Sequence, residues 1–283
     1  MQIAVKFDLS FQYCELERLW RMADRLGFEA VWDYDHFYGP RENTDPNYEG
    51  WTSLAAMAAV TKRARIGCLV SSVTFRNLAV LANMAVTVDH ISGGRLYFGI
   101  GAGWIADEHR AYGIEFPGPG TRVAMVDEAL TVLRMLWTQE SVTFSGQFFT
   151  LEDALCKPKP LQQPHPPIVI GGTEPKMLRV VARHADMWNM PGHEGPQRWG
   201  AVNAQLDEAC AETRRAPAEI LRSAQLSLHP AEAGQVDEQL AMLPEFDSLG
   251  CEQMVLAFRQ PPTEALLKRC LALDSGTRPI AAV

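Results

Sequence analysis

The stretch LYFGIGAG, residues 96–103, shows the pattern that decides the fold: an apolar, β-rich run that ends in a glycine cluster, Gly101-Ala102-Gly103. Eight such runs occur along the chain, each followed by a helix-like stretch. This alternation indicates βαβ units and a parallel sheet, and eight units in 283 residues are typical of a (β/α)₈ TIM barrel of the α/β class. The second, third and fifth runs end in similar clusters, which are Asp35-His36, Ser71-Ser72 and Gly171-Gly172. Chemistry in this architecture sits at the carboxyl ends of the strands, so the four clusters predict one active site.

Composition favours one large domain, which we expect to span residues 1–283, since 47% of them are hydrophobic. Net charge is −8 and the Lys and Arg residues form no dense run, so we expect neither a nucleic-acid nor a membrane partner. The start has no signal-like segment, and no run reaches about 18 apolar residues, which predicts a cytoplasmic protein. Six widely spaced cysteines without a CxxC pair predict free thiols rather than disulfides or a zinc site.

The expected elements include several whose bounds the structure tests. The third run predicts a strand from Ile66 to Val70, and a long connection rich in Gly and Pro precedes a helix from Val123 to Trp137. Alternating residues around Ser145-Gly146 predict a small β-hairpin from Val142 to Leu151, inserted before the fifth strand. Near the end, a helix is expected without interruption from Val236 to Leu249.

The glycine run after the fourth strand has more than one interpretation. Residues 101–106 fit G-x-G-x-x-A, the alanine variant of the Rossmann fingerprint, but that motif normally opens its fold and needs a second strand about 20 residues on. In a barrel, the glycines indicate a place where the backbone comes close to a flat ligand. A simple tight turn is the third interpretation.

Gly171-Gly172-Thr173 stands between a strand and a helix. Backbone N–H groups at the start of a helix form a ready site for phosphate, and Lys176 in the first helical turn could add a positive charge. A diglycine is also an ordinary turn, so both interpretations stay open.

Asp35-His36 is the expected chemical centre. Histidine suits proton transfer near neutral pH, and an adjacent carboxylate can orient it. The alternative is a structural histidine bonded to a carbonyl group. His109 is expected at the same end of the barrel, and no two histidines have the spacing of metal ligands.

Several motifs, in order and at matching intervals, resemble the bacterial luciferase-like superfamily, and within it the branch that uses the deazaflavin coenzyme F420. The resemblance runs from the first strand to about Asn189 and implies a TIM barrel, usually a homodimer, with the cofactor ring at the strand ends. It is carried by AVWDYDHF (30–37), IGCLV (66–70) with TFRN (74–77), DHISGGRL (89–96), GIGAGW (99–104) and PIVIGG (167–172).

The resemblance assigns site residues position by position. Asp35 and His36 match the pair beside the reactive face of the ring, where the histidine is thought to transfer a proton. The other matching positions are Leu69 and Val70 behind the ring, often across a non-prolyl cis peptide, Ala102, Gly103 and Trp104 along its edge, and Gly171, Gly172 and Thr173 in the phosphate loop.

Two departures bear on the substrate. F420-dependent glucose-6-phosphate dehydrogenases have an acidic residue where this chain has Trp104, and a tryptophan where it has Pro40. Oxidation of a sugar phosphate is therefore not expected, and the aromatic side chain suggests a more apolar or planar small molecule.

These observations predict an F420-dependent oxidoreductase that transfers a hydride to or from a small organic substrate. One alternative is an FMN-dependent monooxygenase that takes reduced flavin from a separate reductase and uses oxygen. A second alternative is a cofactor-binding barrel without catalysis, which the missing acid at Trp104 makes conceivable.

Overall fold

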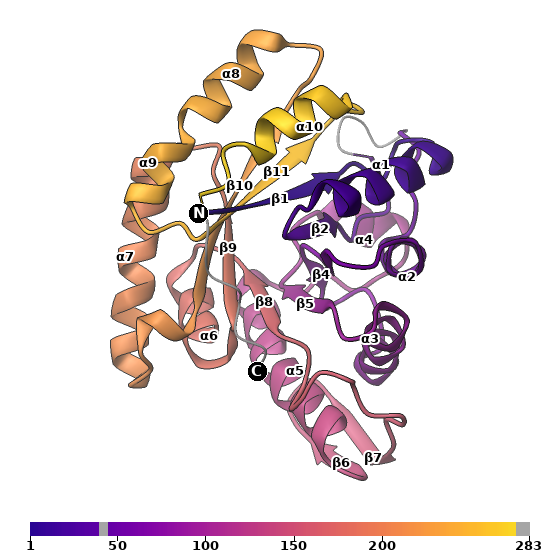
Figure 1. The fold of residues 1–283 in the computed structure, drawn as a ribbon. Helices are drawn as coiled ribbons and strands as arrows, with labels where there is room; N and C mark the ends of the chain where they lie inside the picture. Colours follow the sequence, from indigo (N-terminus) through magenta and orange to yellow (C-terminus); the bar gives the residue numbers. More distant parts are fainter. Residues whose placement is uncertain (40–44, 276–283) are drawn as a thin grey trace.

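The computed structural model describes residues 1–39 and 45–275 and confirms the TIM-barrel fold (Figure 1). The barrel strands, all parallel, are β1 (Gln2–Phe7), β2 (Ala30–Asp33), β3 (Arg65–Cys68), β5 (Leu96–Gly101), β8 (Ile168–Gly171), β9 (Met187–Pro191), β10 (Leu221–Leu228) and β11 (Gln253–Phe258). They pair in chain order, β11 pairs with β1, and the ring closes where Ile66 and Gly67 pair with Leu96 and Tyr97.

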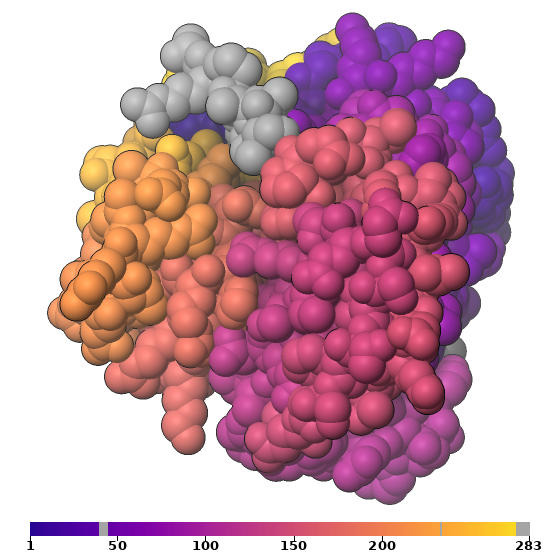
Figure 2. All heavy atoms as spheres, turned by 90° about the horizontal axis from the view of Figure 1, so that it is seen from below, coloured from indigo at the N-terminus to yellow at the C-terminus, as the bar shows by residue number. Residues whose placement is uncertain are grey.

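Helices surround this ring (Figure 1). They are α1 (Tyr13–Leu26), α2 (Gly50–Val60), α3 (Leu78–Ser92), α4 (Ala106–Ala111), α5 (Pro119–Thr138), α6 (Pro175–His184), α7 (Pro196–Thr213), the 3₁₀ helix η1 (Pro217–Glu219), α8 (Ala233–Ala241), α9 (Leu243–Ser248) and α10 (Glu264–Leu271). Seen from below, the magenta middle of the chain and the orange segments that follow it lie side by side on one face (Figure 2). Within the described parts of the chain, no helix combines the length and apolarity needed to cross a bilayer.

Alternation along the strands divides the core into two parts. On β1, Ile3, Val5 and Phe7 point outward and pack with the helices in the larger hydrophobic cluster. Ala4 points inward, where it joins a smaller cluster inside the barrel that includes Trp32 and other side chains of the same orientation. The barrel is therefore a filled core, and polar side chains on its inward face need a specific explanation.

The predicted third strand ends earlier than the sequence suggested. β3 stops at Cys68, the peptide between Leu69 and Val70 is cis, and the chain then forms the short strand β4 (Ser71–Ser72). β4 pairs with the last two residues of β5. The prediction was wrong here because an apolar run has the same composition whether it continues a strand or turns into the barrel.

Helical bounds differ at three further places. The expected helix from Val236 to Leu249 is two helices, α8 and α9, which meet at Met242. Pro244 explains the break, since proline lacks the N–H that a continuous helix requires and clashes with the preceding turn. The short α4 was not predicted, and α5 begins at Pro119 rather than Val123 because proline is well suited to the first helical position.

The inserted hairpin is confirmed and runs slightly further than expected. Its strands are β6 (Val142–Ser145) and β7 (Thr150–Ala154), which pair antiparallel. The hairpin projects from the barrel beside α5 (Figure 1). Backbone N–H groups of residues 147–149 donate to Glu128 of α5, which fixes the turn to the helix.

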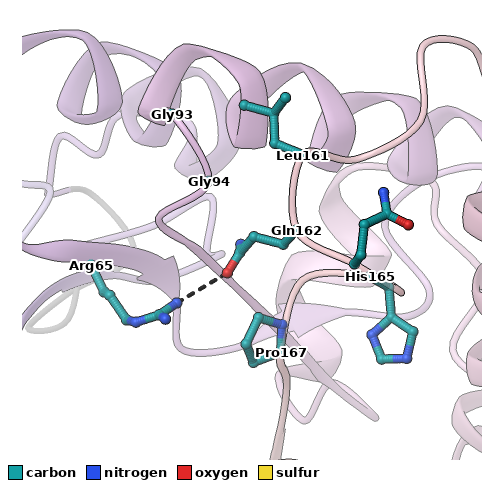
Figure 3. A pocket seen from close by; sticks show the side chains of 8 residues that line it. Arg65, Gly93, Gly94, Leu161, Gln162, His165 and Pro167 are labelled. Carbon is teal, nitrogen blue, oxygen red and sulfur yellow. Dashed lines mark hydrogen bonds between the residues drawn. The ribbon is translucent and has the colours of Figure 1, made fainter. Parts of the chain in front are cut away.

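The amino-terminal end of the barrel holds the Asp89 to Leu96 motif and a cavity of about 400 Å³ (Figure 3). Arg65 donates to Gln162 across this cavity at 3.1 Å, and Gln162 in turn donates to Asp89 and to the Leu96 carbonyl. Arg95 donates to the Ala58, Thr61, Ala64 and Ser92 carbonyls. These groups satisfy one another, so this end of the barrel is structural.

Candidate active site

All four strand-end clusters lie at the carboxyl end of the barrel, as the sequence predicted. Asp35-His36 follows β2, Ser71-Ser72 is β4 itself, and Gly101 and Gly171 are the last residues of β5 and β8. The clusters touch one another: the Ser72 N–H donates to Asp35 at 3.1 Å, and Gly101 and Gly171 both border the side chain of Val70. A ligand at this end can contact more than one cluster.

His36 is held by a carboxylate from elsewhere in the sequence. Its Nδ1 lies 2.9 Å from Oε2 of Glu108, which is fully buried in α4, while the His36 side chain keeps 27% of its surface exposed. The other Glu108 oxygen accepts the backbone N–H groups of Phe37 and Tyr38 at 2.7 and 3.2 Å. Glu108 therefore fixes both the ring and the backbone that carries it.

The charge on Glu108 follows from these contacts. Burial raises the pKa of this carboxyl, but the hydrogen bonds from His36 and the two backbone N–H groups outweigh it and hold the pKa below its ordinary value. An ionised carboxylate only accepts hydrogen bonds, so the proton between the two side chains resides on Nδ1 of His36. Its Nε2 is then the nitrogen that can exchange a proton with a ligand.

Asp35 has a different partner from the one expected. Arg76 donates to both of its oxygens, at 2.6 and 2.8 Å, and also contacts Glu49 at the start of α2. Burial alone would lower the pKa of Arg76. The two acidic partners outweigh this effect and hold the pKa above its ordinary value. The expectation that the adjacent carboxylate orients His36 is not met by these contacts: Asp35 joins β2 to the segment after β4, and Glu108 orients the ring.

The role of Glu108 is not predicted from the sequence, although the neighbouring His109 is expected at this end of the barrel. Because Glu108 lies 72 residues from His36, no local spacing joins them. The available signal was an acidic residue in the first turn of a short helix after a strand end. His109 is buried behind Gly103, with its ring nitrogens 2.7 Å from the Ile105 carbonyl and the Thr74 hydroxyl, and it therefore supports the wall of the site.

Leu69 and Val70 lie at the inner wall of the barrel mouth. A β-carbon at Gly101 would lie 2.7 Å from Val70 Cγ2, and one at Gly171 would lie 3.4 Å from the same atom. Gly101 is therefore required by the close approach of Val70, whereas Gly171 leaves room that a larger side chain would fill. This part of the wall therefore consists of the backbone at Gly101 and Gly171 and of the Val70 side chain.

Ala102, Gly103 and Trp104 continue this wall toward the solvent. The Ala102 carbonyl accepts from Arg122 at 3.1 Å, and Gly103 has a φ of +70° and approaches the Ser72 hydroxyl so closely that a β-carbon would lie 2.4 Å from it. Trp104 is 74% exposed, and its ring stands edge-on to His36 at 5.9 Å between centroids. The indole is thus free to contact a ligand beside His36.

Gly172 and Thr173 lead into α6, whose N-cap residue Glu174 makes no side-chain capping bond. The Gly172 carbonyl is fixed by the Trp188 indole N–H at 2.8 Å, with φ at +140°. A helix start without a side-chain cap is consistent with an anion site, although Pro175 at the first helical position has no N–H, and Lys176 lies exposed in the first turn. Pro40 lies outside the described residues.

A polar layer inside the barrel was also missed. Lys6 faces inward from β1, as do Ala4 and the neighbouring Trp32 of β2, and its ammonium lies over the ring of Tyr34, just after β2. The Tyr34 hydroxyl donates to Asp8 at 2.6 Å, and Arg259, just after β11, approaches Asp8 at 3.6 Å. Lys6 is 7% exposed, and burial, followed by repulsion from Arg259, lowers its pKa from 10.5 to about 7.

Comparison with known proteins places these features in a family. An F420-dependent glucose-6-phosphate dehydrogenase of Kineococcus radiotolerans is 30% identical over 279 residues, which cover 92% of this chain and 80% of that protein. An FMNH₂-dependent dimethylsulfone monooxygenase of Pseudomonas putida is 30% identical over 200 residues, or 69% and 52% of the two chains. An uncharacterized protein of Mycobacterium tuberculosis is 34% identical over 186 residues, 59% of this chain and 64% of that protein.

The last two matches span less than two thirds of the relatives' own lengths. Among solved structures, an F420-dependent secondary alcohol dehydrogenase in complex with an F420–acetone adduct superposes with a TM-score of 0.82 over 95% of this chain and 98% of that one. Its 19% identity shows a shared fold alone. A family model for luciferase-like monooxygenase matches residues 6–264, so the chain belongs to the luciferase-like monooxygenase family.

Proposed function

We propose that this protein is an F420-dependent oxidoreductase that transfers a hydride between the deazaflavin and a small organic substrate at the carboxyl end of the barrel. The observation that carries the proposal is the His36–Glu108 pair, which lies at the same strand ends as the wall of Val70, Gly101 and Gly171. A positioned acid or base next to a flat, backbone-lined surface suits hydride transfer coupled to proton transfer.

The residues at this end fit a deazaflavin. Leu69 and Val70 would back the ring, residues 102–104 would lie along its edge, and residues 171–173 would hold the phosphate at the start of α6. Glycine at position 171 suits this assignment, because a larger side chain beside Val70 would compete with the cofactor for the same place. When bound, the deazaflavin supplies a carbon that accepts or donates hydride.

The protein's own part is to hold the reactants and to move a proton. Glu108 keeps the Nδ1 proton of His36 in place, and the partly exposed ring presents Nε2 to the substrate. Trp104 stands beside the His36 ring and would exclude water from one side of the substrate. Arg76 and Asp35 hold the two loops that carry His36 and Ser72.

An FMN-dependent monooxygenase is the second candidate. It is favoured by the Pseudomonas putida relative, whose name states dependence on FMNH₂. That activity would need a separate reductase to supply reduced flavin. A barrel that binds a cofactor without catalysis would account for Trp104, but it leaves the buried Glu108 beside His36 without a role. We also propose that the protein forms a homodimer, and this part of the proposal is supported only by the family resemblance.

Titration of the purified protein with F420, reduced F420 and FMN tests the proposal. We expect saturable changes in the absorbance and fluorescence of F420, with FMN binding at least about tenfold more weakly. Gly171→Val is the matched control, because it fills the space assigned to the cofactor. Preference for FMN would instead support the monooxygenase, and binding of neither would remove both assignments.

A further inference from the structure

A lysine is buried inside the barrel mouth. Lys6 is the next-to-last residue of β1 and faces inward with Ala4, two residues before it. Its ammonium lies 5.7 Å above the ring centroid of Tyr34. Within residues 1–39 and 45–275, Lys6 donates no hydrogen bond and forms no ion pair. A lysine that is 7% exposed is rarely left in this state.

The neighbouring charges leave Lys6 unbalanced. Arg259 follows β11, the strand that pairs with β1, and approaches Asp8 at 3.6 Å. Asp8 also accepts from Tyr34, so its charge is shared between two other groups. The buried Asp33 on β2 is a weak counterion, because burial and the nearby Asp35 raise its pKa well above the ordinary value.

Lys6 on β1 and Arg259, just after the adjacent β11, are therefore close enough to repel each other, and Asp8 is the carboxylate that Arg259 approaches. Arg259 keeps 27% of its side chain exposed and donates to the Ser227 hydroxyl at 3.3 Å. The other titratable group near Lys6 is the Cys68 thiol, whose pKa burial and Asp33 raise, which keeps it uncharged. A bound anion would supply the missing charge.

We propose that Lys6, Arg259 and Ser227 form a binding subsite for a carboxylate or comparable small oxyanion carried by the substrate. This inference rests on the proposed function for its biological role and names the class of substrate. Tyr34 lies near both groups, because its ring centroid is 5.7 Å from the Lys6 ammonium and 5.7 Å from the His36 ring centroid. We therefore expect a substrate whose anionic group binds Lys6 to extend toward His36.

The chemistry of lysine suits an anion-binding subsite. The ammonium is compact, carries three donors and becomes fully protonated when an anion binds beside it, since a nearby negative charge favours the charged form. Burial without an anion lowers its pKa to about 7, so the free subsite is only partly charged at neutral pH. Binding of a carboxylate should therefore take up a fraction of a proton from solution.

The test uses the cofactor-free protein with sodium malonate and sodium acetate as probes, against sodium chloride at equal ionic strength. At pH 7 we expect a saturable rise of the wild-type Tm, about 3 °C at a tenfold excess over the dissociation constant. Lys6→Met should lose this rise. Lys268→Met is the matched control, because Lys268 is an exposed lysine paired with Glu264 on α10.

A second measurement covers the case in which Lys6→Met does not fold. Arg259→Gln changes the more exposed cation and should weaken malonate binding by about tenfold or more. Acylation of Lys6, followed by mass spectrometry, should slow at least about tenfold with malonate, while Lys268 reacts unchanged. Equal Tm rises in wild type and Lys6→Met, or no malonate effect beyond that of chloride, would overturn the subsite. The F420 titration is independent of this result, so the two proposals can fail separately.

Discussion

The Nδ1 atom of His36 and the Oε2 atom of Glu108 lie 2.9 Å apart although 72 residues separate them in the chain. The carboxylate is buried and the imidazole is partly exposed, so the pair points one free nitrogen toward the barrel mouth. This is the arrangement of a base and its orienting acid in many enzymes. It leads to the first four predictions.

His36→Asn should bind the cofactor nearly as well as wild type but lose turnover by a factor of about 10²–10⁴, the usual contribution of a positioned acid or base. The amide can still donate to Glu108, so we expect the Tm to stay close to that of wild type. Cofactor titration, thermal melting and steady-state kinetics on the two proteins check this. Full turnover in the variant would exclude a proton-transfer role.

The pH–rate profile needs two variants. If His36 transfers a proton during turnover, His36→Asn should change the profile. The structure adds Lys6, whose pKa is lowered to about 7. A limb that disappears in His36→Asn but persists in Lys6→Met belongs to the histidine, and the opposite pattern assigns it to the lysine.

Glu108→Gln should lower kcat by about 10–10³-fold with little change in cofactor affinity. The amide oxygen can still accept from the Phe37 and Tyr38 N–H groups, but the neutral side chain no longer fixes the proton on Nδ1 of His36. A merely structural Glu108 would change the Tm and leave the pH–rate profile as it is. Glu115→Gln, a change to another acidic residue after α4, is the control.

The pH dependence of stability offers a second readout for Glu108. Its folded pKa lies below its unfolded value, so its contribution to stability is present above about pH 4.5 and is lost as the pH falls through the folded pKa. Urea unfolding of wild type and Glu108→Gln should therefore converge in acid. A constant difference down to pH 3 would show that the carboxylate charge does not matter.

Gly171→Val should weaken cofactor binding by about tenfold or more while changing the Tm little. A β-carbon at this position meets Val70 at an ordinary distance of 3.4 Å, and the added methyl groups would extend into the space assigned to the cofactor. Gly118→Val is a control, since no heavy atom lies within 4 Å of a β-carbon there. Equal affinities in wild type and Gly171→Val would remove this loop from the cofactor site.

Arg76→Met should destabilise the protein by about 3–5 kcal/mol, because it leaves the Asp35 carboxylate buried without its bidentate partner. Arg18→Met breaks the exposed pair with Glu15 and should cost less than about 1 kcal/mol. Urea unfolding at neutral pH measures both. Similar decreases in the unfolding free energy of the two variants would mean that the buried pair stabilises the protein no more than the exposed pair does.

Lys6→Met should raise the stability at pH 7. The folded pKa of Lys6, about 7, lies below the ordinary value of 10.5, so in wild type this group makes stability increase with pH between those values. The unfolding free energy of the variant should not show this dependence on pH. The stability difference between the variant and wild type should therefore become smaller toward pH 10. Unfolding at pH 7 and pH 9 measures the difference. A less stable variant at pH 7 would indicate that Lys6 has a structural partner.

The alternation of apolar runs and helical stretches was sufficient to predict the barrel, the inserted hairpin and the end at which the clusters gather, because these depend on local periodicity and on strand direction. The contacts within the site could not be predicted in the same way. Glu108 and Arg76 reach His36 and Asp35 from distant segments, and only the closed ring brings them together. The path of the chain after Cys68 was missed since composition does not report a change of backbone direction.

The lysine on β1 illustrates another limit. In the sequence, Lys6 interrupts an apolar run and could equally mark a strand edge exposed to water. Its burial follows from the inward orientation that β1 takes when it pairs with both β2 and β11. A charged residue inside a barrel can therefore be recognised only once the neighbours on both sides are known.

Because of the close packing around Val70, the two sides of the barrel mouth should differ in how many amino-acid substitutions they tolerate. On the side of β5 and β8, Gly101 has no room for a side chain, and a β-carbon at Gly171 would already contact Val70. On the side of β1 and β11, Lys6 and Arg259 contact Tyr34 and Asp8 instead. We therefore expect substitutions beside β1 and β11 to alter substrate preference, and substitutions beside β5 and β8 to alter the shape of the wall itself.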